Sequence, residues 1–440
     1  MKLSIIIPVF NDVTCIGHAI DSVLKQQFAD WELIIVDDGS TDGTADVIDR
    51  IASTDKRISV VHQVNAGPGA ARNTGLDAAR GEYVAFLDSD DELASTHILA
   101  AMVERIDDRQ CDVLLSRARL AGTSGEAGDE MPWCLRKDIV PDPEGFTPQD
   151  AGVSLFFVAG PVPWGKIYRR KFLSWAQIRF PPLPRSEDFP FVQTAMACAG
   201  KIAVYDGISI LHRTGRATSL ENTKDETPLM FAEAETIFFK MLEDRGLWDE
   251  FALAAKARAM LRLAYNLNAI QSLDGLRAVF AYAYEERKKL DIADIADSFR
   301  DYVSAKRVVD GVLSHGSAEA WVYARMAAAE KALRTKEITL RKAKKDNEML
   351  TKAQDAQNAL LLQSRREVLR LKQRAALMEE KSLALKASES YRVGMFVTWP
   401  VRKALGGVKC LRENGLKYTV RHAVGKVLRL FRLFGSKCAW

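Results

Sequence analysis

The chain of 440 residues is 48% hydrophobic and 27% charged, which is typical of a globular protein but too long for one ordinary domain. Its six cysteines show no Cys-x-x-Cys spacing, which argues against a zinc ribbon or a disulfide framework and favours a reducing cytoplasm. The formal net charge of +4 conceals an asymmetry, because residues 391–440 hold eleven basic residues and a single acid. The basic end is therefore expected to contact an anionic surface.

Strands and helices alternate over the first hundred residues. We expect strands at 3–9, 32–36, 58–62 and 83–87, and helices at 13–27, 44–53 and 69–80. Such alternation predicts right-handed βαβ units and a parallel sheet. The segment Met1–Pro8 is too short and too soon interrupted by proline for a signal peptide, and no run of eighteen apolar residues predicts a membrane-spanning helix.

The second half of the chain is predicted to be helical. Prolines mark loops between 110 and 230, and helical spacing continues from 228 to 313. Residues 320–388 contain neither glycine nor proline, and ten of their sixteen heptad a and d positions are apolar in one register that begins at Leu333. This pattern favours a coiled coil that pairs two copies, and a long solvated single helix is the alternative. Polar a and d residues between 347 and 357 are the expected place for a break.

Two of the apolar runs end in clusters of carboxylates. Residues 34–42 read Ile-Ile-Val-Asp-Asp-Gly-Ser-Thr-Asp, and residues 83–91 read Tyr-Val-Ala-Phe-Leu-Asp-Ser-Asp-Asp. Ligands of open α/β sheets bind beyond the carboxyl ends of the strands, so the two clusters are expected over one crevice. The oxygen ligands of Asp88-x-Asp90 suit Mg²⁺ or Mn²⁺, which bind one or two carboxylates plus substrate phosphates. The pattern therefore predicts a nucleotide-activated substrate.

Several motifs in order resemble those of the inverting family 2 glycosyltransferases, which have the nucleotide-diphospho-sugar-binding fold called GT-A. The matching stretches are residues 5–11 (IIIPVFN), 36–42 (VDDGSTD), 65–75 (NAGPGAARNTG), 81–83 (GEY), 87–91 (LDSDD), 164–168 (WGKIY) and 187–188 (ED). The resemblance covers about half of the chain. It implies an α/β fold with a mostly parallel twisted sheet flanked by helices, followed by a helical region, a coiled coil and a basic amphipathic tail.

The resemblance also implies the nucleotide-binding residues. Asp38 is expected to accept a hydrogen bond from the base, usually uracil, although the same residues suit a turn and a helix cap. Pro8 and Val9 end the first strand where the backbone of the family meets the base, and Asn65 and Arg72 are expected to reach the nucleotide. Arg72 could equally form a core-facing salt bridge with the acidic clusters.

Metal binding is assigned by the same resemblance to Asp88 and Asp90. Asp88 is expected to touch the ribose as well, and Asp90 to bind the Mn²⁺ or Mg²⁺ that bridges the two phosphates. Such an ion neutralises the leaving nucleoside diphosphate. Asp91 and Glu92 are expected to support this loop or to begin a helix.

Asp188 occupies the position of the family's catalytic base, with Glu187 expected to orient it. An inverting transfer needs a carboxylate within hydrogen-bond reach of the acceptor hydroxyl. The simpler alternative is an acidic pair that begins a helix. Ser186 stands where the family often has glycine.

The acceptor side is assigned to Trp164 and Lys166, which match a Trp-x-Lys signal of the family, although a strand aromatic packed under the site is an equal alternative. Arg213 and Ser219 resemble the loop that closes over the diphosphate. A histidine such as His212 is more often structural.

The basic tail interleaves aromatic and leucine side chains with arginine and lysine. This suits an amphipathic helix in the interface of an anionic membrane, and docking on the acidic body of the protein is the alternative. No motif for nucleic acid accompanies the charge. We expect a peripheral protein on the inner face of the bacterial plasma membrane.

The predicted domains are a catalytic domain (1–227), a helical domain (228–319), the coiled coil (320–388) and the tail (389–440). The predicted function is metal-dependent transfer of a sugar from a nucleotide-diphospho-sugar, expected to be UDP-linked, to a cell-surface glycan such as lipopolysaccharide, exopolysaccharide or capsule. The alternatives are a non-catalytic assembly protein that binds nucleotide sugars and a sugar nucleotidyltransferase. The latter lacks its expected glycine-rich phosphate loop, because residues 8–12 read Pro-Val-Phe-Asn-Asp.

Overall fold

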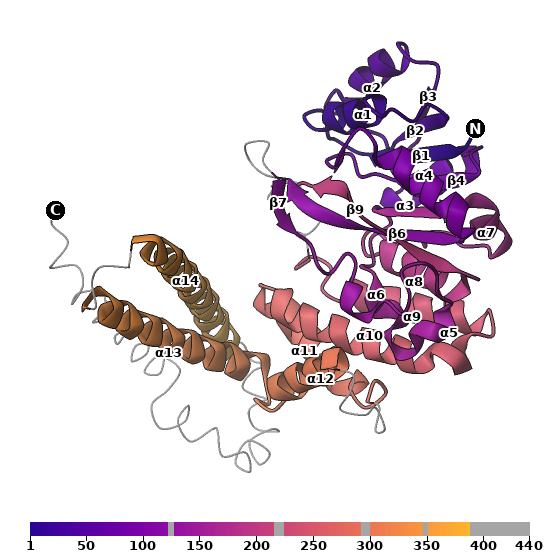
Figure 1. Ribbon diagram of the computed structural model, residues 1–440. Coiled ribbons are helices and arrows are strands. Elements are labelled where there is room, and N and C mark those ends of the chain that lie inside the picture. Colours follow the sequence, from indigo (N-terminus) through magenta and orange to yellow (C-terminus); the bar gives the residue numbers. More distant parts are fainter. Residues whose placement is uncertain (122–126, 215–223, 292–299, 346–350, 388–440) are drawn as a thin grey trace. The chain divides into compact units, whose positions relative to one another are not determined.

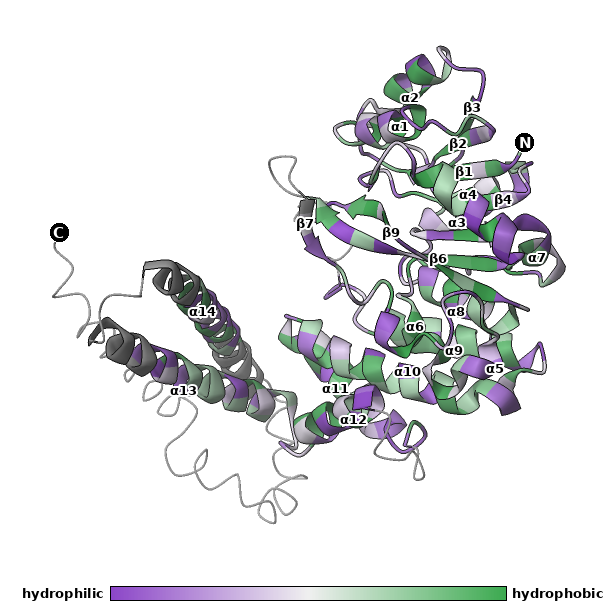
Figure 2. Ribbon diagram, in the orientation of Figure 1, coloured by the Kyte–Doolittle hydropathy of each residue, from purple (hydrophilic) through white to green (hydrophobic). Residues whose placement is uncertain are grey.

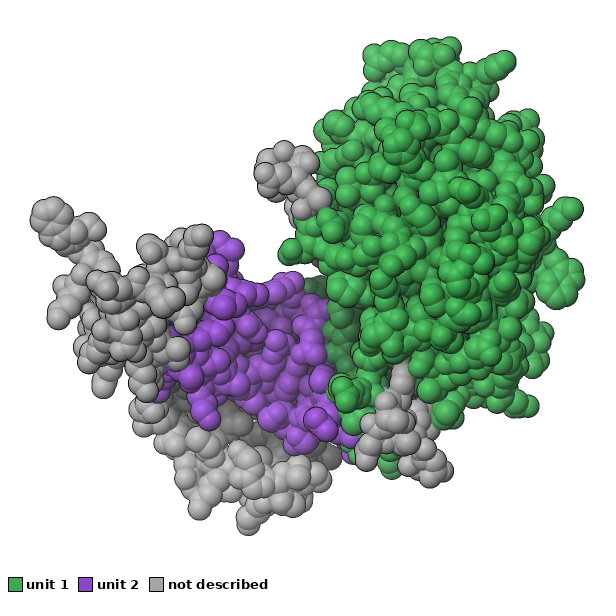
Figure 3. All heavy atoms as spheres, viewed as in Figure 1, with its two compact units in different colours: residues 1–266, 286–306 green, residues 267–285, 307–440 purple. Residues whose placement is uncertain are grey.

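The computed structural model describes most of the chain (Figure 1). The described residues are 1–121, 127–214, 224–291, 300–345 and 351–387. They form two compact units, coloured separately in Figure 3. Unit 1 comprises residues 1–266 and 286–306, and unit 2 comprises residues 267–285 and 307–440.

The elements follow the predicted alternation. The strands are β1 (Leu3–Val9), β2 (Trp31–Asp37), β3 (Ile58–His62), β4 (Tyr83–Phe86), β5 (Glu92–Leu93), β6 (Val113–Ala121), β7 (Ala127–Glu130), β8 (Lys166–Arg169) and β9 (Ile202–His212). The helices up to α9 are α1 (Ile16–Leu24), α2 (Thr44–Ala52), α3 (Pro68–Ala78), α4 (Ile98–Arg109), α5 (Pro148–Ala151), α6 (Leu155–Val158), α7 (Arg170–Trp175), α8 (Asp188–Cys198) and α9 (Met230–Glu243), with short 3₁₀ helices η1 (Lys137–Ile139) and η2 (Gly152–Ser154). The later helices are α10 (Trp248–Ala269), α11 (Leu273–Glu286), α12 (Arg300–Leu313), α13 (Ala318–Lys345) and α14 (Thr351–Ala387).

In the described residues the strands form one nine-stranded sheet in the order β3-β2-β1-β4-β8-β6-β9-β5, with β7 paired to β6. The first four strands are parallel, as predicted, with β1 between β2 and β4. The other half is mixed, because β8 runs antiparallel to both β4 and β6 whereas β6 and β9 are parallel. The expected GT-A class of α/β fold is confirmed, but the sheet is parallel in its amino-terminal half only.

Alternation along β1 fills two cores, one on each face of the sheet. Ile5 and Ile7 belong to the cluster that includes residues of α1 and α4, whereas Ile6 belongs to the cluster that includes residues of α3, α8 and α9. Successive strand side chains point to opposite faces, so a strand buried on both sides reads as an unbroken apolar run. Strand β6 differs, because Ser116, Arg117 and Arg119 follow its apolar start, and Figure 2 shows both apolar and polar residues along it.

Helix α9 belongs to the core of unit 1. Its Phe238 ring meets Phe156 and Phe189 edge-on, at centroid distances of 5.0 and 5.2 Å. The predicted domain boundary after residue 227 therefore lies inside a packed unit. The next helix, α10, contributes Arg262, whose guanidinium lies 3.6 Å from the centre of the Phe189 ring and pairs with the buried Glu235 at 3.1 Å.

The segment predicted as a coiled coil forms two helices that pack antiparallel within the chain. Met326 of α13 packs with Leu371 and Ala375 of α14, and Leu333 packs with Leu361 and Val368. The apolar heptad positions whose side chains the structure describes are thus buried against one another in a single chain. Helix α13 ends at Lys345 and α14 begins at Thr351, next to the predicted break. Pairing of two copies stays a prediction. The basic tail lies outside the described residues.

No helix in the part of the chain that the structure describes is both long enough and apolar enough to cross a bilayer.

Candidate active site

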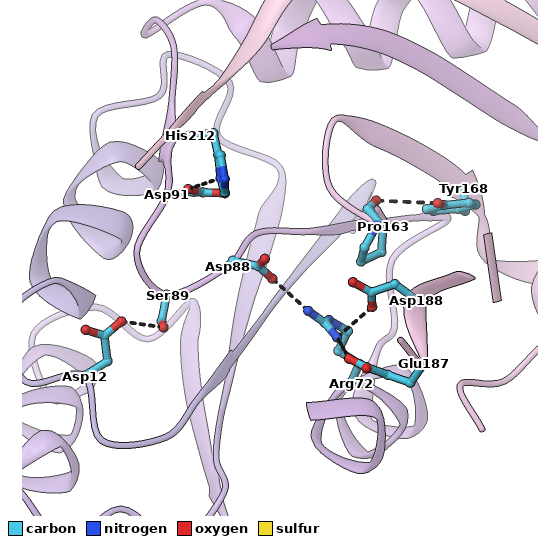
Figure 4. Close-up of polar contacts among 10 residues, drawn as sticks. All are labelled: Asp12, Arg72, Asp88, Ser89, Asp91, Pro163, Tyr168, Glu187, Asp188 and His212. Carbon is cyan, nitrogen blue, oxygen red and sulfur yellow. Dashed lines mark hydrogen bonds and ion pairs between the residues drawn. The ribbon is translucent and has the colours of Figure 1, made fainter. Parts of the chain in front are cut away.

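One arginine side chain binds acidic residues that lie at the end of β4 and at the start of α8 (Figure 4). Arg72, on α3, donates from Nη1 to Glu187 at 2.7 Å and to Asp188 at 2.9 Å, and from Nη2 to Asp88 at 2.9 Å. Asp88 follows β4, and Asp188 begins α8. Burial disfavours the charged guanidinium, but the three carboxylates outweigh it and raise the pKa of Arg72. Of the two alternatives for Arg72, the structure shows the salt bridge to the acidic clusters.

Asp188 lies in surroundings that suit a proton acceptor. Its removal from water raises the pKa of the carboxyl well above its usual range, the Arg72 charge opposes this rise, and the carboxyl groups of Glu187 and Asp88 add to it. The Asp188 side chain keeps 25% of its surface exposed, whereas Glu187 is buried. A carboxylate with a raised pKa binds a proton more readily, as a general base must. Glu187 and Asp188 accept from the same Arg72 guanidinium, and an orienting role of Glu187 in catalysis stays a prediction.

The turn before this acidic pair is under conformational constraint. Ser186 has φ +63°, in the left-handed region that favours glycine. This is the position where glycine is frequent in the family that the motifs resemble. Serine here keeps the same turn at some strain, so the departure in sequence leaves the backbone geometry in place.

The acidic loop after β4 is tied to the end of β9. Asp91 is fully buried, and its carboxylate accepts from His212 Nδ1 at 2.9 Å and from the backbone N–H of Arg213 at 3.0 Å. Burial raises the pKa of Asp91 to about 6, against the effect of His212. Burial works against the charged imidazole, but the hydrogen bond to Asp91 raises the pKa of His212 above its usual value. Asp91 and His212 are thus structural, as expected.

Arg213 also supports the acidic loop. Its Nη2 donates to Glu92 at 2.9 Å and its Nε donates to the carbonyl of Asp90 at 3.3 Å. These contacts place Arg213 beside the predicted metal ligands. Ser219, the other residue predicted for this loop, lies outside the described residues.

On the nucleotide side, Asp38 holds the loop that precedes α3. Its buried carboxylate accepts from Gln63 Nε2 at 2.7 Å and from the backbone N–H groups of Ala66 at 2.9 Å and Gly67 at 2.8 Å. An ionised carboxylate has about four acceptor positions, so roughly one remains for a ligand. Asp38 is therefore structural in part, and its contact with a base stays a prediction.

The other residues predicted for the nucleotide frame this loop. Pro8 and Val9 end β1, as expected, and the carbonyl of Val9 accepts the backbone N–H of Asp38 at 2.9 Å. Asn65 is exposed at the turn that follows β3. The ends of β1 and β2 and this turn thus lie together, and a shared crevice with the acidic loop after β4 stays a prediction.

Trp164 and Lys166 lie beneath the site rather than in the open. Trp164 is buried and stacks on His212, with ring centres 5.3 Å apart and an angle of 24°. The ammonium group of Lys166 donates to the carbonyl of Val162 at 2.7 Å, and burial lowers the pKa of Lys166 to about 8. The structure shows the packing interpretation of Trp164, and contact with an acceptor stays a prediction.

One residue that positions the acidic loop was not recognised in the sequence. Asp12, just beyond β1, accepts the Ser89 hydroxyl at 2.6 Å (Figure 4). Asp12 is buried and its backbone N–H donates to Thr44 Oγ1 at 2.9 Å. The sequence signal that could have identified Asp12 is its position three residues after the end of a buried strand.

The carboxylates of the acidic loop suit a divalent cation that completes its coordination shell with oxygen atoms of the substrate. Among the described residues no three His, Cys, Asp or Glu side chains are grouped to hold a metal ion. Mg²⁺ needs only one or two carboxylates when phosphates and water supply the remaining ligands. Asp88 and Asp90 are both partly exposed and would provide these two hard oxygen ligands.

Comparisons with known proteins find one matching family model and several similar proteins. Residues 4–173 match the family model described as glycosyl transferase family 2. A protein named "Uncharacterized glycosyltransferase EpsJ" from Bacillus subtilis (strain 168) is 32% identical over 209 residues, which are 46% of this chain and 58% of that protein. The "Poly(ribitol-phosphate) beta-glucosyltransferase" of Bacillus spizizenii is 31% identical over 228 residues, which are 50% of this chain and 34% of that protein.

A crystal structure of S. aureus TarS 1-349 is 25% identical, covers 72% of this chain and 92% of that one, and has a TM-score of 0.44. The chain spans less than two thirds of the length of the two Bacillus proteins. The family match extends from β1 to α7 and includes Arg72, Asp88 and Asp90. Residues 4–173 of this chain are therefore similar to glycosyl transferase family 2.

Proposed function

We propose that this protein is a metal-dependent inverting glycosyltransferase that moves a sugar from a nucleotide-diphospho-sugar, UDP-linked, to a cell-surface glycan. The observation that carries the proposal is the convergence of Asp88 and Asp188 on the Arg72 guanidinium, each at 2.9 Å. This contact brings the loop expected to hold the donor next to the carboxylate expected to deprotonate the acceptor. The similarity of residues 4–173 to glycosyl transferase family 2 supports the same activity.

In the proposed reaction an acceptor hydroxyl attacks the anomeric carbon of the donor. Asp188 accepts the hydroxyl proton as the new C–O bond forms, and the bond between the anomeric carbon and the diphosphate oxygen breaks on the opposite face. The electron pair of that bond leaves with the nucleoside diphosphate. The Arg72 guanidinium holds the Asp188 carboxylate at 2.9 Å and is itself held by Glu187 at 2.7 Å. Because the acceptor attacks the face opposite the leaving diphosphate, the anomeric configuration is inverted.

The donor is expected to lie over the ends of β1, β2 and β4. Asp38 has about one acceptor position left for the N–H of a base, and Asp88 and Asp90 would hold Mn²⁺ or Mg²⁺ against the diphosphate. When bound, such an ion stabilises the negative charge that develops on the leaving diphosphate. Arg213, anchored to Glu92 at 2.9 Å, lies beside this loop and is placed to approach the same phosphates.

A relative named for transfer to poly(ribitol phosphate) supports a polymeric acceptor. We extend this to a surface glycan of the cell, such as lipopolysaccharide, exopolysaccharide or capsule. The basic tail supports a place beside the membrane, at its inner face, where a lipid-linked glycan would be reached. Removal of residues 391–440 should shift the protein from the membrane fraction to the supernatant and leave donor turnover intact; unchanged partition would contradict this placement.

The direct test measures release of nucleoside diphosphate from a panel of UDP-, GDP- and TDP-sugars, with Mn²⁺ and with a chelator. We expect turnover of a UDP-sugar that the chelator abolishes and that Asp90→Ala lowers to background. Asp108→Ala, at an exposed position near the end of α4, is a control that should leave turnover unchanged. Turnover that is undiminished by both the chelator and Asp90→Ala would exclude the metal-dependent mechanism.

A further inference from the structure

Helix α8, which carries Asp188 in its first turn, begins without a local cap. Within the residues that the structure describes, its N-cap residue, Glu187, forms no side-chain cap hydrogen bond, and the preceding Ser186 has φ +63°. A capping side chain normally binds the first N–H groups of a helix, so a start without one depends on contacts from other elements. Arg72 of α3 supplies such contacts to Glu187 and Asp188.

The residue after Asp188, Phe189, is held by a guanidinium from α10. The central carbon of the Arg262 guanidinium lies 3.6 Å from the centre of the Phe189 ring, and Phe189 is 2% exposed. The negative face of an aromatic ring attracts a cation placed over it. Because Asp188 and Phe189 are consecutive residues of one helical turn, a fixed ring limits the movement of the backbone that carries the Asp188 carboxylate.

Arg262 is itself fixed to α9. Its Nη2 donates to the carbonyl of Phe231 at 3.2 Å, and its Nε lies 3.1 Å from a carboxyl oxygen of the buried Glu235. Phe238 of the same helix meets the Phe189 ring edge-on, at a centroid distance of 5.2 Å. The Phe189 ring is thus contacted by both α9 and α10, and the guanidinium that touches it is bound to α9 as well.

A buried guanidinium is not the simplest side chain to fill this part of the core. The Arg262 side chain keeps only 13% of its surface exposed. Removal of a charge from water is unfavourable, and apolar side chains of similar volume often stabilise a core as well or better. Arginine offers what they lack, a rigid planar group that hydrogen-bonds to α9 and stacks on a ring at the same time. This combination favours a role in placing Phe189 over a role in stability alone.

We propose that Arg262 is a positioning residue for Asp188, which holds the first turn of α8 through the Phe189 ring so that the carboxylate meets the acceptor hydroxyl. The inference rests on the proposed function of Asp188 as the base. Arg262 lies outside residues 4–173, which match the family model. A misplacement of about 1 Å can cost about 10²-fold in rate, so a small movement of this turn is sufficient to slow transfer.

The test compares two arginines of α10 that contact different rings. Arg258 lies about one helical turn before Arg262, and its guanidinium lies 5.4 Å from the ring of Phe157 on α6. Arg262→Met should lower kcat for release of nucleoside diphosphate about tenfold or more and change KM for the donor less than about twofold, because the donor loops stay in place. Arg258→Met is the matched control and should change kcat less than about threefold.

A second measurement needs no substrate. Hydrogen–deuterium exchange of the peptide that spans residues 186–192 should be faster in Arg262→Met than in the wild type and in Arg258→Met, because the turn is held less firmly. Arg262→Lys keeps a cation near the ring but loses the planar group, so it should lie between the wild type and the methionine variant in both measurements. If Arg262→Met does not fold, Arg262→Lys is compared with Arg258→Lys in the same way.

Faster exchange together with slower turnover, both specific to Arg262, supports the proposal. Either effect without the other, or equal effects in the Arg258 variant, would overturn it. A wild type that turns over no nucleotide sugar would contradict the proposed function instead. The exchange of residues 186–192 would then still decide whether Arg262 holds the turn that carries Asp188.

Discussion

Arg72 and Glu187, 115 positions apart in the sequence, form a buried ion pair at 2.7 Å. The same guanidinium holds Asp188 and Asp88, so one residue of α3 fixes the acidic start of α8 against the end of β4. The catalytic geometry and the stability of unit 1 therefore depend on the same contacts.

Replacement of Arg72 by alanine should destabilise the protein and abolish transfer. Removal of one partner from a buried charge cluster costs about 3–5 kcal/mol, because uncompensated carboxylates are left away from water. Chemical denaturation followed by circular dichroism measures this loss. Arg179→Ala, which removes an exposed arginine paired with Asp77, is the control and should cost less than about 1 kcal/mol. Equal losses in the two variants would contradict a central role for Arg72.

Asp188→Asn should remove turnover while nucleotide binding is retained. The amide has nearly the same shape but cannot take the proton, and general-base catalysis contributes about 10²–10⁴-fold to the rate. Single-turnover assays give the rate, and calorimetry with UDP and Mn²⁺ gives the binding. A parallel loss of binding and turnover would mean that Asp188 only maintains the structure. Glu187→Gln should lower the rate less, since it acts through Asp188 and Arg72.

Glu235 should make the stability of the protein fall as the pH rises. Burial raises the pKa of Glu235 to about 8 from a usual value near 4.5, while Arg262 and Arg258 oppose the shift and Glu286 adds to it. Between these two pH values the folded state holds a proton that the unfolded state has released, so the free energy of unfolding is lowered by rising pH. The contribution is complete below about pH 4.5 and is lost by about pH 8.

Thermal denaturation from pH 5 to pH 8.5 tests this dependence, with Glu235→Gln as the comparison. Glutamine carries no proton to lose, so the variant should show a flatter profile and a relative gain in melting temperature toward pH 8. Profiles that run parallel over the whole range would show that Glu235 is ionised in the folded state throughout.

Leu333→Ala should loosen the pair of helices α13 and α14. Leu333 is buried against Leu361 and Val368, and truncation of a buried leucine costs about 2–5 kcal/mol. Limited proteolysis should cleave α14 sooner in this variant than in the wild type. The exposed Leu369 gives the control, because its replacement by alanine removes no buried contact of that pair. Identical digestion of all three proteins would contradict the packing.

The predicted association of two copies is tested separately. Sedimentation velocity at micromolar concentration should show a dimer if exposed apolar positions of α14 pair between chains. A monomer in the full-length protein would contradict the predicted dimer and would fit the burial of the described heptad positions within one chain.

Much of the amino-terminal fold followed from local sequence alone. The strands at Leu3–Val9 and Ile58–His62 agree with their predicted bounds, and β2 and β4 differ by a single residue at one or both ends. Such accuracy has a physical cause, since strands buried on both faces must be apolar throughout and end where the chain turns back. Tertiary contacts decided what no local pattern contains. Half of the sheet is mixed because β8 inserts antiparallel between β4 and β6.

For the site, the sequence determined which residue types follow which strands, so Asp88, Asp90, Glu187 and Asp188 could be named in advance from their motifs. Only the tertiary structure decided their partners. Arg72 had two equally good interpretations because a guanidinium binds a phosphate or a carboxylate with the same hydrogen-bond geometry. Its position among three carboxylates depends on α3, β4 and α8 meeting in space.

The same limit applies to the carboxyl-terminal helices. A heptad pattern records that one face is apolar, but it does not record whether the matching face belongs to another copy or to the same chain. The sequence therefore determined that Leu333 and Val368 are buried, and the antiparallel packing of α13 on α14 decided that they are buried against each other. Hydrophobic burial is non-directional, so the identity of the covering surface is fixed only by the path of the folded chain.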